Sequence, residues 1–102
     1  MSPPPETPIL RLLRAWEAIN AEADAYVVDD SLSIDEQDAL FDRLFWSRAR
    51  AVAKEMMEIP CTCAADFAAK LIVVTLRGFT CVQDWNTGAI WPEARRLTGT
   101  PL

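Results

Sequence analysis

Residues 63–77, with the sequence CAADFAAKLIVVTLR, decide the fold of this chain. At the 100° per residue of an α-helix, the charged side chains Asp66, Lys70 and Arg77 fall on one narrow strip, and apolar side chains cover the rest. Residues 71–76 would also suit a buried strand, but the helical spacing of the charges and the helix formers at 64–70 favour a helix. We therefore expect a central helix from residue 62 or 63 to Gly78, with only its charged strip reaching solvent.

A long helix is expected to precede this central one. Ser33 and Glu36 form a capping box at its start, and Pro60 ends it. Trp46 and Met57 lie well away from the main apolar arc, so this helix is expected to have two packing surfaces.

Two charged residues on the apolar arc of the long helix need an explanation. Arg48 and Glu55 lie seven residues apart on that arc, where an isolated charge is costly. Either their ends reach water at the edge of the arc, or they meet Asp66 and Lys70 across the helix pair.

Weaker signals delimit the two ends of the chain. Thr7 offers an N-cap and Pro8 a first helical residue for a helix near residues 9–26, and a short last helix is expected over residues 92–97. Residues 79–91 give no clear assignment. The sequence thus predicts an all-α fold, a small bundle of three main helices plus a short C-terminal helix. Residues 1–6 are expected to be a flexible proline-rich lead, and residues 7–102 a single helical domain.

The net charge of −5 is concentrated in the first half of the chain. Nine acids and no base lie between Arg14 and Arg43. Such a segment repels nucleic acid and anionic membranes and attracts a basic partner. The simpler interpretation is a solvated segment that keeps the protein in solution. The candidate partner-binding residues are two apolar side chains of the long helix and four acids, namely Trp46, Met57, Asp29, Asp30, Asp35 and Asp38.

The residue types present argue against catalysis. The chain has no histidine, the commonest general base and metal ligand, and no glycine-rich phosphate loop. Its three cysteines have no repeated spacing and no fourth ligand for zinc. We therefore expect a protein that is not an enzyme, with no catalytic residue, no metal, no cofactor and no small-molecule substrate. With no secretory signal and no membrane span in sight, a cytoplasmic location with reduced thiols is expected.

Several segments resemble a family of short, uncharacterised α-helical proteins from bacterial genomes and prophages. They are Trp16, the acidic turn, residues 38–44, residues 59–62 leading into 68–71, and residues 93–97. The resemblance implies an all-α fold and a mobile-element origin, and it carries over no catalytic residue.

Two functions are consistent with these features. The first is a small helical interaction or regulatory protein that binds a protein partner, a second copy of itself included, through a helical surface. The alternative is an acidic, phosphate-mimicking inhibitor of a nucleic-acid-binding protein, such as a bacterial defence complex, in the manner of anti-CRISPR proteins. Neither involves direct binding of nucleic acid or membrane.

Overall fold

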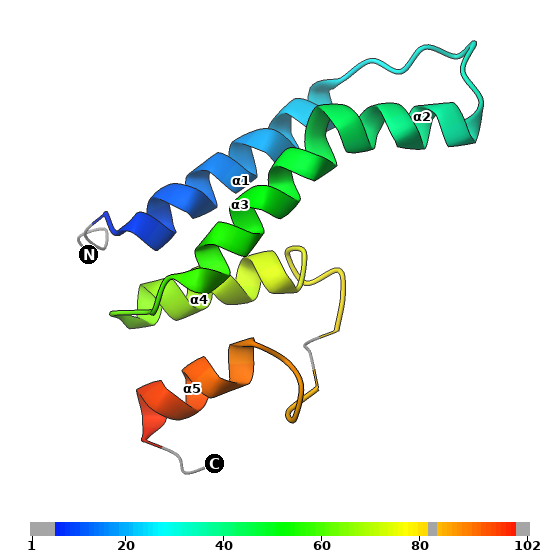
Figure 1. Ribbon diagram of the computed structural model, residues 1–102. Helices are drawn as coiled ribbons and strands as arrows, with labels where there is room; N and C mark the ends of the chain where they lie inside the picture. The colour runs from blue at the N-terminus through cyan, green and yellow to red at the C-terminus, as the bar shows by residue number, and fades with distance from the viewer. Residues whose placement is uncertain (1–5, 82–83, 100–102) are drawn as a thin grey trace.

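The computed structural model describes residues 6–81 and 84–99, and these ranges contain helices and no strand (Figure 1). The elements are α1 (Pro8–Ala25), α2 (Ile34–Phe41), the π-helical segment η1 (Asp42–Trp46), α3 (Ser47–Glu58), α4 (Ala64–Val74) and α5 (Ile90–Thr98). Since α2, η1 and α3 follow one another without a break, they form one long rod. The all-α prediction of three main helices plus a short C-terminal helix is confirmed. Most of the proline-rich lead, residues 1–5, lies outside the described residues.

The predicted start of α1 is confirmed. Thr7 is its N-cap, with Oγ1 accepting a hydrogen bond from the Leu10 N–H at 3.1 Å, and Pro8 is the first helical residue. Buried side chains recur along one side of the helix, so α1 packs through a single stripe: Ile9, Trp16, Ile19 and Ala23.

The rod begins at the predicted capping box and contains a π-helical turn that the sequence did not predict. Ser33 Oγ accepts from the Glu36 N–H, and the Glu36 carboxylate accepts from the Ser33 N–H, each at 3.1 Å. Within η1 the helix widens, because the Ser47 N–H donates to the Asp42 carbonyl, five residues back. The rod ends at Glu58, two residues before Pro60.

The helix over residues 62–78 is shorter than predicted. It stops at Val74 because Thr75 Oγ1 donates to the Leu71 carbonyl at 2.7 Å and accepts from the Gly78 N–H at 3.0 Å, closing a turn. Leu76 and Arg77 both take positive φ values, 51° and 60°. Such values are uncommon for side chains of this kind and mark a constrained turn.

The predicted orientation of α4 is wrong. Asp66 and Lys70 are only 1% and 2% exposed, whereas Leu71 is 37% exposed and Leu76 in the following turn is 50% exposed. Only Arg77, the third residue of the strip, reaches solvent. The charged pair faces inward because each of its members finds several hydrogen-bond partners there.

A buried polar network surrounds Asp66. Its Oδ1 accepts from Thr7 Oγ1 at 2.5 Å, and its Oδ2 accepts from the N–H and Oγ1 of Thr62 at 2.9 and 3.0 Å. Burial raises the pKa of Asp66, but these hydrogen bonds outweigh it and leave the pKa below its usual value. The carboxylate therefore ties the start of α1 to the start of α4.

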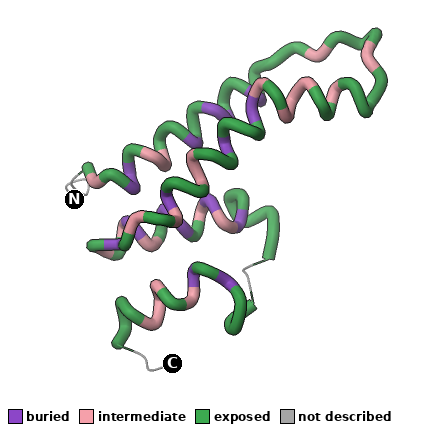
Figure 2. Tube along the Cα trace, in the orientation of Figure 1, coloured by how far each residue is buried: buried purple, intermediate pink, exposed green. Residues whose placement is uncertain are grey.

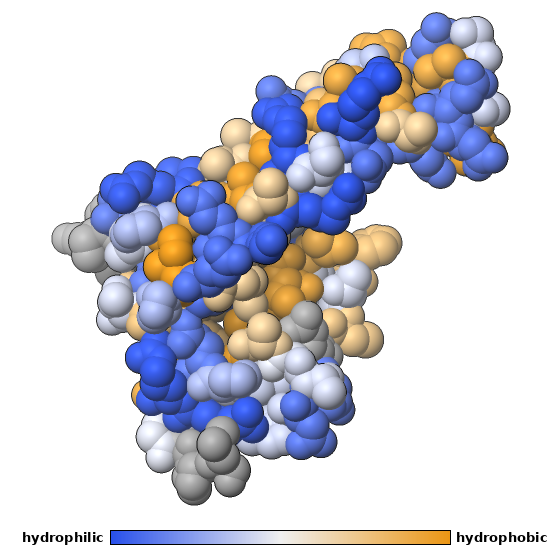
Figure 3. All heavy atoms as spheres, in the orientation of Figure 1, coloured by the Kyte–Doolittle hydropathy of each residue, from blue (hydrophilic) through white to orange (hydrophobic). Residues whose placement is uncertain are grey.

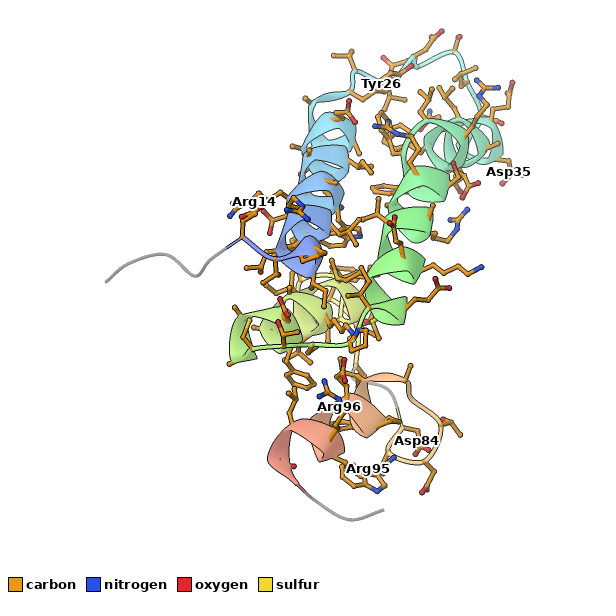
Figure 4. All side chains as sticks on the ribbon, turned by 60° about the vertical axis from the view of Figure 1, so that its left-hand side comes forward. Arg14, Tyr26, Asp35, Asp84, Arg95 and Arg96 are labelled. Atoms are coloured by element: carbon orange, nitrogen blue, oxygen red, sulfur yellow. The ribbon has the colours of Figure 1, made fainter. Side chains whose placement is uncertain are left out.

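Lys70 joins α4 to α5 through Glu93. Lys70 Nζ donates to the Ile59 carbonyl at 2.6 Å and lies 2.8 Å from Glu93 Oε1, which also accepts from the Cys61 N–H at 2.8 Å. The Arg96 guanidinium lies 2.8 Å from Glu93 Oε2 and donates to the Cys61 carbonyl at 2.7 Å. Figure 4 shows the place of Arg96 on α5. Burial raises the pKa of Glu93, but these donors outweigh it and lower the pKa to about 2.

The predicted last helix is present and somewhat longer than expected. α5 begins at Ile90, so Pro92 lies in its first turn, where a missing N–H costs no helical hydrogen bond. Gly99 ends it with φ of 71°. The undecided segment 79–91 has a turn in which Asp84 accepts from the Asn86 N–H at 3.1 Å. Residues 82 and 83 lie outside the described residues.

The core lies where α1, α3 and α4 meet, and α2 projects away from it (Figures 1 and 2). No side chain of α2 is buried. The radius of gyration is 16.0 Å, compared with about 13 Å for a compact domain of this length. The molecule is therefore an elongated body with a projecting arm, defined here as residues 26–41.

Candidate interaction surface

A large hollow lies between α1, α3 and the turn that follows α4. Its volume is about 860 Å³, within the range of ligand and partner sites. We call it the tryptophan groove, and it is lined by Trp16, Asn20, Trp46, Ala49, Arg50, Ala53, Val73, Leu76, Arg77, Gly78 and Phe79.

The groove has a buried floor and an exposed apolar rim. Trp16 on α1 is 3% exposed and belongs to the core, whereas Trp46 on η1 is 36% exposed. On the opposite side, the left-handed turn after α4 carries Leu76 and Phe79, which are 50% and 89% exposed. Figure 3 shows hydrophobic surface gathered below α3, over the end of α4. Several large apolar side chains thus meet water around one hollow.

Two arginines supply the positive charge of the groove. Arg50 lies 2.7 Å from Asp42, and the side chains are 64% and 50% exposed. Arg77 lies 4.0 Å from Asp24, and its guanidinium is 5.9 Å from the centre of the Trp16 ring. Exposed pairs of this kind contribute little to stability, so both arginines can exchange these partners for others.

The arm holds the four candidate acids together. Asp29, Asp30, Asp35 and Asp38 are all exposed, and no salt bridge to them is found within the described part of the chain. Asp29 accepts from the Ser31 N–H at 2.9 Å, which lowers the pKa of Asp29, and Figure 4 shows Asp35 at the outer side of α2. The arm is therefore an acidic projection.

The arm also carries apolar side chains. Val27 and Ile34 are 87% and 76% exposed. At its base, Tyr26 packs edge-on against Phe41 and Phe45, with ring centres 5.5 and 5.6 Å apart. These contacts fix where the arm leaves the body.

Trp46 and Met57, the two apolar candidates, lie at different places. Trp46 lines the tryptophan groove, whereas Met57 lines a smaller hollow of about 340 Å³ beside Pro92 and Glu93. The proposed contact of Arg48 and Glu55 with Asp66 and Lys70 is wrong. Arg48 instead pairs with Glu22 at 3.0 Å, and Glu55 is exposed.

Sequence reasoning missed the far side of the groove. Leu76 and Phe79 belong there because the chain turns left-handed at two non-glycine residues, Leu76 and Arg77. In the sequence, Gly78 was the one residue of this region that predicted a turn, and in the structure its φ is 86°. The exposed arginine at the end of the charged strip was visible in the sequence, but its place over Trp16 was not.

The cysteines offer little chemistry in their observed places. Cys61, Cys63 and Cys81 are all free. Cys61 is buried, and burial raises the pKa of its thiol to about 12, which keeps it protonated. Within residues 6–81 and 84–99, no group of three or more cysteine, aspartate or glutamate side chains is placed to hold a metal ion.

Comparison with protein-family models, with curated proteins and with solved structures finds no match. The resemblance to short helical proteins of bacterial genomes and prophages therefore stays a prediction. None of the helices in the described part of the chain has the length and apolar character needed to cross a membrane.

Proposed function

We propose that this chain is a non-enzymatic interaction or regulatory module that binds a protein partner through the tryptophan groove. The observation that carries the proposal is the 89% exposure of Phe79, which lies on the rim beside Leu76 and across the groove from Trp46. Burying side chains of this size contributes roughly 2 kcal/mol each, and aromatic anchors of this kind dominate protein interfaces.

The shape of the groove favours a protein over a small molecule. Small-molecule sites enclose most of the ligand, and their apolar lining is largely shielded from water. Here the rim is open on both sides, at Trp46 and at Leu76 and Phe79. An apolar helix or extended segment laid along this groove covers both sides at once.

The proposal extends to the location and the origin of the protein. The three free cysteines support a reducing, cytoplasmic location. A mobile-element origin is supported by the sequence resemblance to short helical prophage proteins, and it suits a regulatory protein of this size.

Photo-crosslinking in the producing cells tests the proposal. A photoreactive phenylalanine derivative at position 79 should give an adduct with a defined protein, and the same group at Leu97, an exposed site on α5, should not. Adding Leu76→Asp should abolish the adduct at position 79, and aspartate tolerates the positive φ there better than most side chains. Equal adducts from both positions, or an adduct that survives Leu76→Asp, would contradict the proposal.

A second candidate function rests on the exposed acids of the arm. Asp29, Asp30, Asp35 and Asp38 project from the body and have no basic partner in the described residues, as a phosphate-mimicking inhibitor of a nucleic-acid-binding protein requires. Reversing all four to lysine should abolish binding to a basic nucleic-acid-binding protein. A control of equal net charge reverses four exposed acids outside the arm, Glu17, Glu22, Glu55 and Glu58. If both variants lose binding equally, only net charge matters and this candidate fails.

A further inference from the structure

The rod formed by α2, η1 and α3 has Trp46 at its midpoint. It runs from Ile34 to Glu58, so Trp46 lies twelve residues from either end. The half after Trp46 lines the tryptophan groove, and the half before it belongs largely to the arm. A two-fold axis near Trp46 therefore lays the arm half of one copy along the groove half of another.

Charges of opposite sign are placed symmetrically about this midpoint. Asp42 and Arg50 lie four residues on either side of Trp46, and Asp38 and Lys54 lie eight residues on either side. In two antiparallel rods centred on Trp46, Asp38 and Asp42 of one copy come opposite Lys54 and Arg50 of the other. Complementary charges of this kind set the register and direction of paired helices.

The face that carries these charges is open to solvent. Asp42 and Arg50 contact each other at 2.7 Å along one side of the rod, and Trp46 lies between them in the sequence. Asp38 and Lys54 are also exposed. The exposed Asp42–Arg50 pair contributes little by itself, so both members can exchange it for a partner in a second copy.

Each half of the rod leaves one side uncovered in the single chain. α2 has no buried side chain, and its continuation α3 packs into the core on one side only. The groove half lies beside the exposed Leu76 and Phe79. One symmetric contact covers both, since each copy supplies what the other lacks.

We propose that the protein forms a symmetric dimer in which the α2–η1–α3 rods of two copies pack antiparallel around Trp46 and close each other's tryptophan groove. The inference rests on the proposed function, because it names a second copy of this chain as the occupant of that groove. In this arrangement Asp38 on the arm faces Lys54 of the other copy, and Asp42 in η1 faces Arg50 of the other copy.

A charge-exchange experiment tests this arrangement. In the dimer, Asp38→Lys sets lysine against Lys54, and Lys54→Asp sets aspartate against Asp38, so each variant alone should dimerise about tenfold more weakly. An equimolar mixture of the two variants should regain the wild-type affinity, because every contact then joins opposite charges. The double variant should regain it as well. Sedimentation equilibrium at low salt measures all of these affinities.

A matched control uses a charge outside the rod. Glu17→Lys changes the net charge as Asp38→Lys does, at an exposed position of α1, and should leave dimerisation unchanged. Circular dichroism shows whether each variant keeps its helices.

Three outcomes would overturn the inference: a wild-type chain that stays monomeric at millimolar concentration, variants that dimerise as well as the wild type, or a mixture no stronger than its components. A monomeric chain that still forms the position-79 adduct with a different protein removes this inference and leaves the proposed function in place. Equal adducts from positions 79 and 97 remove the proposed function itself.

Discussion

Asp66 and Lys70 on α4 are 1% and 2% exposed and bind several groups each, whereas Asp35 and Asp38 on the arm are open to solvent with no basic partner in the described residues. The first pair connects α4 to the start of α1 and to α5. Asp35 and Asp38 join no two elements within the described chain. Charged side chains of the same types thus hold the body together in one region and leave a free surface in the other.

The largest expected loss of stability comes from removing the buried ammonium group of Lys70. Lys70→Met should lower the free energy of unfolding by about 4 kcal/mol, because Glu93 and the Ile59 carbonyl stay largely buried without their donor. The matched exposed change, Lys54→Met, should have no measurable effect on the free energy of unfolding of a dilute sample. Urea denaturation followed by circular dichroism measures both free energies of unfolding. Equal losses in the two variants would contradict the role of Lys70 as a buried link between α4 and α5.

Acid titration should sharpen the same contrast. The pKa of Glu93 is lowered from an ordinary value near 4.5 to about 2, so its contribution is complete above pH 4.5 and is lost as the pH falls through 2. The loss is on the order of 3 kcal/mol. Glu93→Gln should remove this part of the pH dependence and leave the part that comes from Asp66, whose pKa is also lowered. A pH profile unchanged by Glu93→Gln would count against the network.

The two helix caps provide a smaller comparison. Thr7→Ala removes both the α1 cap and a hydrogen bond to buried Asp66, so it should cost about 2 kcal/mol of global stability. Ser33→Ala removes a cap on the exposed arm and should speed hydrogen exchange in α2 alone. Hydrogen exchange combined with denaturation separates the two effects. A global loss from Ser33→Ala would show that the arm supports the body.

The smallest effect is expected from the arm acids. Asp35→Asn together with Asp38→Asn should leave the unfolding midpoint of a dilute sample unchanged, since no basic side chain of the described chain pairs with them. Thermal denaturation at low micromolar concentration is the measurement. A clear drop in the midpoint would mean that these acids stabilise the fold after all.

The start of α1, the start of the rod and the end of α5 could be predicted from the sequence, because their causes are local. Thr7, the box formed by Ser33 and Glu36, and Gly99 each act on backbone groups within a few residues. The orientation of α4 could not be read, because the partners of Asp66 and Lys70 lie far away, at Thr7 and Glu93. Helical periodicity alone predicts that a charged strip faces solvent. The strip of α4 faces inward because its hydrogen-bond partners come from other parts of the chain.

The candidate site was predictable on one side only. Helical spacing separated Trp46 from the main apolar arc, and Trp46 does lie on the rim of the groove. Nothing in the residue types of Leu76 and Arg77 indicates the left-handed turn that brings Phe79 opposite it. The π-helical segment likewise has no sequence signal that we can identify.

That π-helical segment sets the direction in which α2 faces. Its wide turn holds more residues than an ordinary α-helical turn, so deleting a single residue between 42 and 46 would restore regular winding. The deletion would leave α2 facing nearly the same way, whereas a deletion within an ordinary α-helical turn would rotate α2 about the rod axis by roughly 100°. The wide turn thus absorbs one residue of chain length without changing where the acidic arm points.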